Sequence, residues 1–240
     1  MTDSVTDSVT TCVALLGGSF DPVHHGHIAL AELCAQLLHP DELRIMPAGQ
    51  PWQKAGLQAS DADRVAMLQL ALQAGNFPPG VKVGIDTREV DRKTPTYTVE
   101  TLRELRAELG PDASLVFVMG ADQLQKLDTW RDWHSLFDLA NFVVAARPGY
   151  SLEEAGLAPA VAAELAQRKS TPEDVRASAA GRVCLAHTLA VDISATEVRQ
   201  TLKNSVKSGT VNEANAASKA GACLAPQVLD YIQQHNLYKS

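Results

Sequence analysis

Short apolar runs alternate with longer amphipathic segments along the chain from residue 13 onward. The apolar runs are rich in β-branched residues and show no alternation of apolar and polar positions, which predicts parallel strands buried on both faces. The segments between them place apolar residues at helical spacing. A chain organised in this way forms a parallel sheet with helices on both faces. The predicted strands are Val13–Leu16, Leu43–Met46, Val81–Ile85, Leu115–Met119 and Phe142–Ala146, and the predicted helices cover Ile28–Leu38, Ala62–Ala74 and the stripe Val99, Leu102, Leu105 and Leu109.

The second half of the chain has weaker periodicity. The run Thr171–Asp174 favours a helix start, and Pro226 opens a short amphipathic helix near the end. Residues 204–223 are small and polar, and we interpret them as a flexible insertion. Residues 1–11 carry no hydrophobic period and are interpreted as a disordered tail. With about 150 residues per domain as a guide, we expect a single domain over residues 12–240.

Charge and cysteine content narrow the class of protein. The 21 basic and 28 acidic residues give a net charge of −7, which argues against binding to nucleic acid. No apolar run approaches the roughly 18 residues that cross a bilayer, and the polar, acidic start does not resemble a secretory signal. Four widely spaced cysteines form no CxxC pair, so we expect them to be reduced and to act as small hydrophobes. These features predict a soluble cytoplasmic protein with no membrane partner.

A glycine-rich turn follows the first predicted strand and precedes the first predicted helix. Its sequence is Gly17-Gly18-Ser19-Phe20-Asp21-Pro22-Val23-His24-His25-Gly26-His27. A strand, a glycine-rich turn and a helix in this order can hold a phosphate, although neither GxGxxG nor a P-loop is present. His24 and His27 are three positions apart, so on a first helical turn they share one face and can donate hydrogen bonds to phosphate oxygens. Metal binding and simple helix capping are the alternative interpretations.

A second element with anion-binding chemistry lies near the other end of the chain, at residues 193–199. Ser194 and Glu197 have the spacing of a capping box, which predicts a helix that starts at Ala195. The N-terminus of that helix can bind an anion, and Arg199 follows one turn later.

Together the two elements resemble the signatures of the HxGH nucleotidyltransferase superfamily. Gly18-x-Phe20-x-Pro22 with His24-x-Gly26-His27 is similar to its first motif, and Ile193-Ser194-Ala195-Thr196-x-x-Arg199 is similar to its second. The resemblance implies an α/β fold with a Rossmann-like, doubly wound parallel sheet and a small C-terminal helical portion. It implies transfer of a nucleoside monophosphate from a triphosphate, with release of pyrophosphate. It also implies that the triphosphate contacts Gly17, Gly18, Ser19, Phe20, His24, His27, Ile193, Ser194 and Arg199.

Three further stretches resemble the nicotinate mononucleotide adenylyltransferase family, so that the likeness covers nearly the whole chain from residue 12 apart from 204–223. They are Asp86–Val90 with Pro95–Leu102, Met119–Asp122 with Leu127–Trp130, and Pro226–Tyr238. This resemblance assigns Tyr97, Thr98 and Trp130 to the acceptor, and Gly120 and Asp122 to the nucleotide pocket. A helix start at Thr98 can receive a carboxylate, and an indole can stack on a pyridine ring. Helix capping, core packing and a turn are the plain structural alternatives for these residues.

One stretch departs from the family pattern. The family often carries Pro-Pro-His-(Lys/Arg) after the second strand, whereas this chain has Pro51-Trp52-Gln53-Lys54. Lys54 can still supply a cation to a phosphate.

The expected reaction is direct attack by the phosphate of nicotinate mononucleotide on the α-phosphorus of ATP, which makes nicotinate adenine dinucleotide in NAD biosynthesis. Mg²⁺ arrives with ATP and needs no all-protein metal site. His24, His27, Lys54 and Arg199 neutralise the phosphate oxygens. The alternatives are a phosphopantetheine adenylyltransferase, a metal-dependent hydrolase built on His24, His25 and His27, and a nucleotide sensor without activity. The sequence leaves the oligomeric state open.

Overall fold

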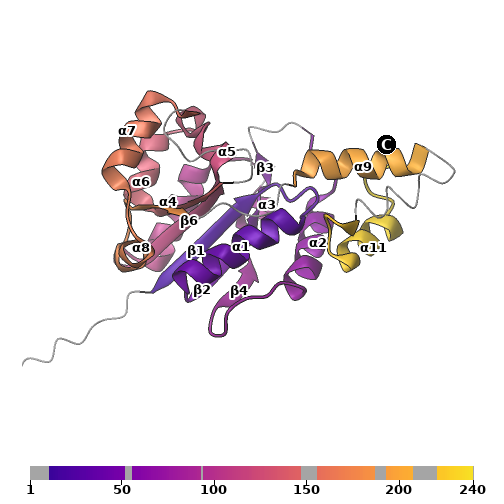
Figure 1. The fold of residues 1–240 in the computed structure, drawn as a ribbon, viewed down its shortest axis with the longest axis horizontal. Helices are drawn as coiled ribbons and strands as arrows, with labels where there is room; N and C mark the ends of the chain where they lie inside the picture. The colour runs from indigo at the N-terminus through magenta and orange to yellow at the C-terminus, as the bar shows by residue number, and fades with distance from the viewer. Residues whose placement is uncertain are drawn as a thin grey trace, which may run out of the picture.

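Six strands form one parallel sheet in the order β4-β2-β1-β6-β7-β8 (Figure 1). The computed structural model describes residues 11–51, 56–92, 94–146, 156–186, 193–207 and 221–239. All five predicted strands are present in the sheet, and the parallel arrangement is confirmed. The strands are β1 (Cys12–Gly18), β2 (Glu42–Pro47), β4 (Lys82–Ile85), β6 (Ser114–Gly120), β7 (Asn141–Ala145) and β8 (Val183–Ala186).

Two features of the sheets were not predicted. β8 has only four residues, and a short apolar run cannot be assigned to a strand by periodicity alone. The two-residue strands β3 (Gln50–Pro51) and β5 (Pro95–Thr96) form a separate parallel pair. This pair brings the segment after β2 beside the start of the predicted acceptor region.

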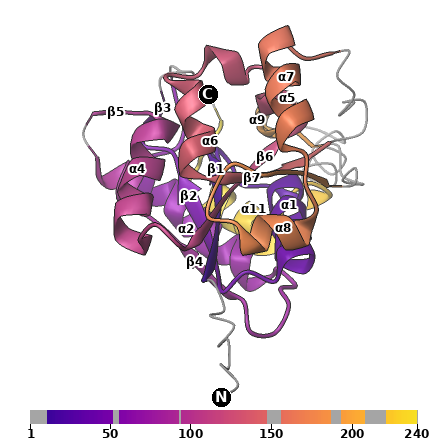
Figure 2. The same cartoon turned by 90° about the vertical axis from the view of Figure 1, so that its left-hand side faces the viewer.

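Helices cover both faces of the sheet, as predicted. Alternate strand residues enter two separate hydrophobic clusters, so that Leu16 and Val118 pack on one face and Leu15 and Phe117 on the other. In Figure 2, α4 and α6 lie on one side of the strands and α1 and α8 on the other. The first face is covered by α1 (His25–Leu38), α2 (Asp61–Gln73), α8 (Pro172–Ala177), α9 (Ala195–Lys207) and α11 (Pro226–Gln234). The second is covered by α4 (Thr98–Leu109), α5 (Ala121–Leu124), α6 (Leu136–Leu139) and α7 (Pro159–Arg168).

Local capping signals predicted the starts of α9 and α8. Ser194 Oγ accepts from the Glu197 backbone N–H at 3.2 Å, and the Ser194 N–H donates to the Glu197 carboxylate at 3.3 Å, so the predicted capping box and the start at Ala195 are confirmed. Thr171 and Asp174 form a second capping box at the predicted start of α8. α1 is a correction, because it begins at His25 and not near Ile28. Its N-cap is His24, a residue type that rarely marks a helix start.

The structure describes two parts of the predicted insertion at residues 204–223. α9 continues to Lys207, so residues 204–207 are helical. At the other end of the segment, the Cys223 carbonyl accepts from the His25 N–H at 2.8 Å. Residues 1–10 and 208–220 lie outside the described residues.

The strand order places a topological switch between β1 and β6. Numbered along the chain, the six strands run 3-2-1-4-5-6, and the paired neighbours β1 and β6 are followed by helices on opposite faces. In sheets of this type, ligands bind outside the carboxyl ends of the strands at the switch point. The glycine-rich turn after β1 and Gly120 at the end of β6 both lie there. Two short elements, α3 (Arg88–Asp91) and the 3-10 helix η1 (Leu127–Thr129), precede other predicted site residues.

Candidate active site

A cavity of about 330 Å³ opens at the switch point. Its wall is formed by the ends of β1 and β6 and by the first turns of α1, α4 and α9. The histidines near the amino end of the chain and the arginine near its carboxyl end therefore share one cavity. The predicted site residues that line it are Gly17, Gly18, Ser19, His24, His27, Thr98, Gly120, Asp122, Trp130, Ser194 and Arg199.

The two histidines of the turn form a stacked pair. Their ring centroids are 3.7 Å apart and the rings are inclined by 26°. The His24 backbone N–H donates to His27 Nδ1 at 3.2 Å. A ring nitrogen that accepts a hydrogen bond carries no proton, so the proton of the neutral His27 ring is on Nε2. Nε2 is therefore the atom of His27 that can donate to a substrate oxygen.

Gly26 and Phe20 pack closely against the two histidines. A Cβ at Gly26 would lie 3.1 Å from His24 Nδ1 and 3.6 Å from the Ile193 carbonyl oxygen, so the glycine allows the imidazole to lie against the helix start. The Phe20 ring meets the His27 ring edge-on, with centroids 4.8 Å apart. Phe20 has 0% exposure and is not among the residues that line the cavity, so its assignment to the triphosphate stays a prediction. Its ring packs against His27.

The second phosphate element meets the same turn. Arg199 lies on the first turns of α9, and its guanidinium donates to the Asp21 carbonyl oxygen at 2.5 Å and to Thr196 Oγ1 at 3.3 Å. Ser194 lines the cavity, whereas the Ile193 side chain packs against the hydrophobic core and lines no part of it. Sequence reasoning missed Thr196, which does line the cavity.

Helix N-termini add positive potential to the cavity. The first turns of α1, α4 and α9 all contribute to its wall. Unpaired N–H groups and the helix dipole favour an anion at such a position, by about 0.3–1 kcal/mol per helix and charge at exposed sites. A chain with net charge −7 therefore still provides a local site for a polyphosphate.

The other end of the cavity contains the predicted acceptor residues. Thr98 is the first residue of α4 and lines the cavity. Trp130 also lines it, and its ring meets Phe117 edge-on at 6.0 Å between centroids. Tyr97, the N-cap of α4, is not among the residues that line the cavity, and its ring lies beneath the guanidinium of Arg131 at 4.6 Å. Its assignment to the acceptor stays a prediction.

Glu89 is a cavity residue that sequence reasoning missed. It belongs to α3 and accepts from Thr101 Oγ1 at 2.7 Å. Burial raises the pKa of the Glu89 carboxyl, against the hydrogen bonds from Thr101 and Thr96. A Cβ at Gly49 would lie 1.9 Å from the Glu89 carbonyl oxygen, so only glycine lets the loop after β2 pack this closely on α3. The sequence shows an acidic residue here, but its burial follows only from this packing.

Lys54, the predicted additional cation, lies outside the described residues.

The metal-site alternative for the three histidines can be compared with the structure. Among the residues that the structure does describe, no three His, Cys, Asp or Glu side chains gather as a metal-binding set. His25 belongs to the motif but directs Nδ1 to the Ala222 carbonyl, 3.2 Å away, whereas His24 and His27 line the cavity. The hydrolase alternative, which needs all three histidines together, is not favoured.

The structure also bears on the expectations for the cysteines and for membrane-spanning helices. The four cysteines are free, and Cys12, Cys34 and Cys184 are buried, as expected of small hydrophobes. Within the described ranges, no helix has the length and the apolar character needed to cross a membrane.

Comparison with known proteins identifies the class of protein to which this fold and cavity belong. A model of the cytidylyltransferase-like family matches residues 15–201. Proteins named as probable nicotinate-nucleotide adenylyltransferases are similar along the full length. The one from Herminiimonas arsenicoxydans is 50% identical over 97% of this chain and 99% of the relative, and the one from Laribacter hongkongensis is 44% identical over 95% and 94%. The chain belongs to the nicotinate-nucleotide adenylyltransferase family.

Solved structures share the fold. Plasmodium falciparum nicotinic acid mononucleotide adenylyltransferase complexed with NaAD superposes with a TM-score of 0.71 at 18% identity, over 95% of this chain and 97% of that one. A putative nicotinate-nucleotide adenylyltransferase from Vibrio parahaemolyticus superposes with a TM-score of 0.57 at 14% identity, over 96% and 97%. The expected Rossmann-like fold is confirmed.

Gly26→Ala tests the packing of the histidine pair. The added methyl group would lie 3.1 Å from His24 Nδ1, so we expect the ring to shift and turnover to fall by on the order of tenfold or more, with a small change in melting temperature. The control is Gly84→Ala, because a Cβ there meets nothing within 4 Å. Unchanged turnover in Gly26→Ala would show that the close approach to His24 has no role in the reaction.

Glu89→Gln tests the buried carboxyl by its effect on stability. Since the folded-state pKa is raised above the unfolded value, the folded protein binds the proton more tightly, and its stability falls as the pH rises through the folded pKa. Glutamine removes this loss and keeps an acceptor for Thr101. We expect the melting temperature of the variant to rise relative to wild type between pH 5 and pH 8. The exposed Glu173→Gln serves as control, and parallel curves for Glu89→Gln and wild type would contradict the assignment.

Proposed function

We propose that this protein transfers AMP from ATP to nicotinate mononucleotide, giving nicotinate adenine dinucleotide and pyrophosphate in NAD biosynthesis. The observation that carries the proposal is the single cavity at the switch point, which brings His24, His27 and Arg199 together with Thr98 and Trp130. Membership of the nicotinate-nucleotide adenylyltransferase family supports this reaction over phosphopantetheine adenylyl transfer.

The mechanism is direct displacement at the α-phosphorus of ATP. The phosphate of the acceptor is ionised near pH 7, so no general base is needed to make it a nucleophile. The protein aligns the two substrates and stabilises the charge of the transition state. Alignment of two bound reactants supplies up to about 7–11 kcal/mol of the barrier. His27 Nε2 and the Arg199 guanidinium are the donors that we assign to the phosphate oxygens, with His24 stacked behind His27.

Magnesium is proposed to enter with ATP. The Asp122 carboxylate lines the cavity, and Gln123 Nε2 donates to it at 2.9 Å. One carboxylate suits a cation that takes its remaining ligands from phosphates and water. When bound, the ion neutralises charge on the triphosphate and on the leaving pyrophosphate.

A preference for the acid over the amide follows from the acceptor end of the cavity. The first N–H groups of α4 have no partners within the helix and can donate to a carboxylate near Thr98. An amide in the same place lacks the negative charge that the helix N-terminus favours. We assign Trp130 to the pyridine ring and Gly120 to the nucleotide, and we place the reaction in the cytoplasm, where cysteines stay reduced.

Product identification tests the reaction. The protein is incubated with ATP and Mg²⁺ and, in separate samples, with nicotinate mononucleotide, nicotinamide mononucleotide or phosphopantetheine. We expect nicotinate adenine dinucleotide and stoichiometric pyrophosphate, with less product from the amide. Pyrophosphate release with phosphopantetheine alone, or ATP binding without product, would overturn the proposal in favour of the corresponding alternative.

His27→Ala tests the transition-state role. Loss of a donor that acts mainly in the transition state lowers kcat by about 10²-fold and leaves the Kd for ATP nearly unchanged. The matched control is His25→Ala, because His25 directs its ring to the Ala222 carbonyl. Steady-state kinetics and equilibrium ATP binding separate the two effects. Equal losses in turnover and binding would assign His27 to ground-state binding only.

Trp130→Ala tests the acceptor end. Stacking on an aromatic ring contributes about 0.5–1.5 kcal/mol, so we expect the KM for nicotinate mononucleotide to rise roughly two- to tenfold while the KM for ATP stays nearly constant. Trp133→Ala is the control, because Trp133 packs on His134 and does not line the cavity. A change confined to ATP would remove Trp130 from the acceptor site.

A further inference from the structure

Asp21 is a buried carboxylate in the turn between the glycines and the histidines. It has 2% exposure, and burial of a charge is unfavourable unless hydrogen bonds compensate. Among the described residues, three donors meet it. The Gln58 N–H donates to Oδ2 at 2.8 Å, the Ala59 N–H to Oδ1 at 3.1 Å and the Tyr238 hydroxyl to Oδ1 at 2.7 Å. Two of the donors are backbone groups, so Tyr238 is the side chain on which this carboxylate depends.

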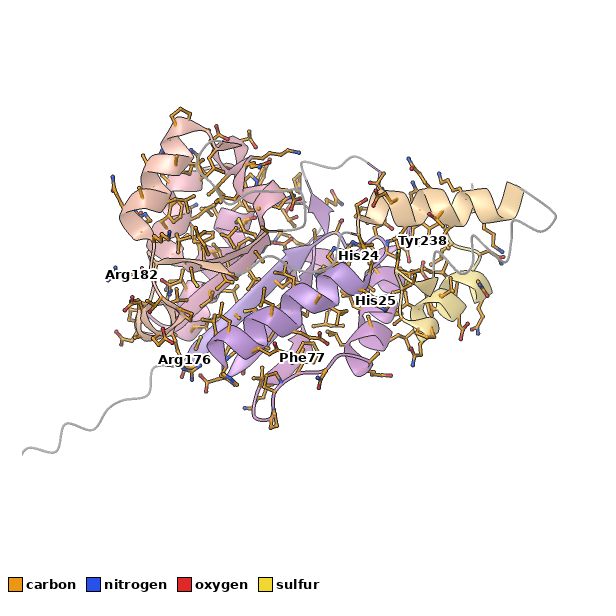
Figure 3. The ribbon with its side chains drawn as sticks, viewed as in Figure 1. His24, His25, Phe77, Arg176, Arg182 and Tyr238 are labelled. Carbon is orange, nitrogen blue, oxygen red and sulfur yellow. The ribbon has the colours of Figure 1, made fainter. Side chains whose placement is uncertain are left out.

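Tyr238 comes from the far end of the chain, 217 positions after Asp21. Figure 3 shows it at the same end of the molecule as His24 and His25, opposite Arg176. Its side chain is buried at 5% exposure, and its backbone adopts φ of 62°, a left-handed conformation that a bulky residue adopts only at a cost. Burial and the bond to Asp21 raise the pKa of the Tyr238 hydroxyl, which therefore keeps its proton and remains a donor.

The backbone of Asp21 connects the same turn to the second phosphate element. Arg199 donates to the Asp21 carbonyl oxygen at 2.5 Å, three residues before His24. The side chain of Asp21 thus joins the histidine turn to the C-terminal segment through Tyr238, and its carbonyl joins the turn to α9 through Arg199. Neither Asp21 nor Tyr238 lines the cavity, so neither contacts a ligand bound within it.

From this arrangement we propose that Tyr238 is a positioning residue for adenylyl transfer. Through Asp21 it holds the turn that carries His24 and His27, and it thereby sets their position relative to Arg199. The inference rests on the proposed function, because the reaction is what this alignment serves. It predicts that Tyr238, a residue near the C-terminus that does not line the cavity, affects turnover.

Tyr238→Phe tests the proposal, because it removes the hydroxyl and keeps the buried ring. We expect kcat to fall about tenfold, with smaller changes in the KM values, since misalignment acts chiefly on the transition state. The matched control is Tyr231→Phe. Tyr231 also lies in the C-terminal segment, and its hydroxyl donates to the Asp63 carboxylate at 3.0 Å. Asp63 lies on α2 and outside the turn. Equal losses of kcat in both variants, or a lower melting temperature with unchanged kcat in Tyr238→Phe, would reduce Tyr238 to a stabilising residue.

A double-mutant cycle with Asp21→Asn tests whether Tyr238 acts through Asp21. If it does, the losses of kcat in Tyr238→Phe and Asp21→Asn are not additive, and additive losses would overturn the proposed route. The ring-proton NMR signals of His24 and His27 give a readout that needs no activity. We expect them to shift in Tyr238→Phe and to stay in place in Tyr231→Phe, and unshifted signals in both would refute the positioning role. Product formation by wild type with ATP and nicotinate mononucleotide decides the proposed function separately.

Discussion

The central sheet is apolar on both faces, and the need to cover both faces decides where a ligand site can form. Leu16 and Leu15 are neighbours in β1, yet they pack into clusters on opposite sides of the sheet. The chain must therefore leave some strands toward one face and some toward the other. Between β1 and β6 these directions diverge, and the cavity opens at their carboxyl ends. The first turns of α1, α4 and α9 contribute to its wall.

Local electrostatics then matter more than the overall charge. A net charge of −7 is unfavourable for long-range attraction of a polyanion. At distances of a few ångströms, however, the stacked imidazoles, the Arg199 guanidinium and the helix N-termini dominate the potential. Glu89 and Asp122 are the acidic members of the cavity wall. The site thus combines donors for a triphosphate with carboxyl groups that limit how much negative charge it accepts.

The histidine turn is held mainly by parts of the chain that are distant in sequence. Cys223 accepts from the N-terminal amide of α1, Arg64 donates to the Ser19 carbonyl at 2.8 Å, and Tyr238 donates to Asp21. Arg64 is fully buried, and its other terminal nitrogen pairs with Asp61 at 2.5 Å. None of these three residues is among those that line the cavity. α9 contributes both to the cavity, through Thr196 and Arg199, and to the core, through Val198 and Leu202.

The sequence by itself determined the features that arise from local interactions. Five strands, the capping box at Ser194, the helix start at Thr171–Asp174 and the two phosphate motifs could be predicted, because periodicity and caps act within a few residues. The tertiary structure alone decided the burial of the Glu89 carboxyl, the contact of the Tyr97 ring with Arg131 and the contacts of Asp21. Each depends on residues that are distant in the chain, whose approach is set by packing and leaves no local pattern in the sequence.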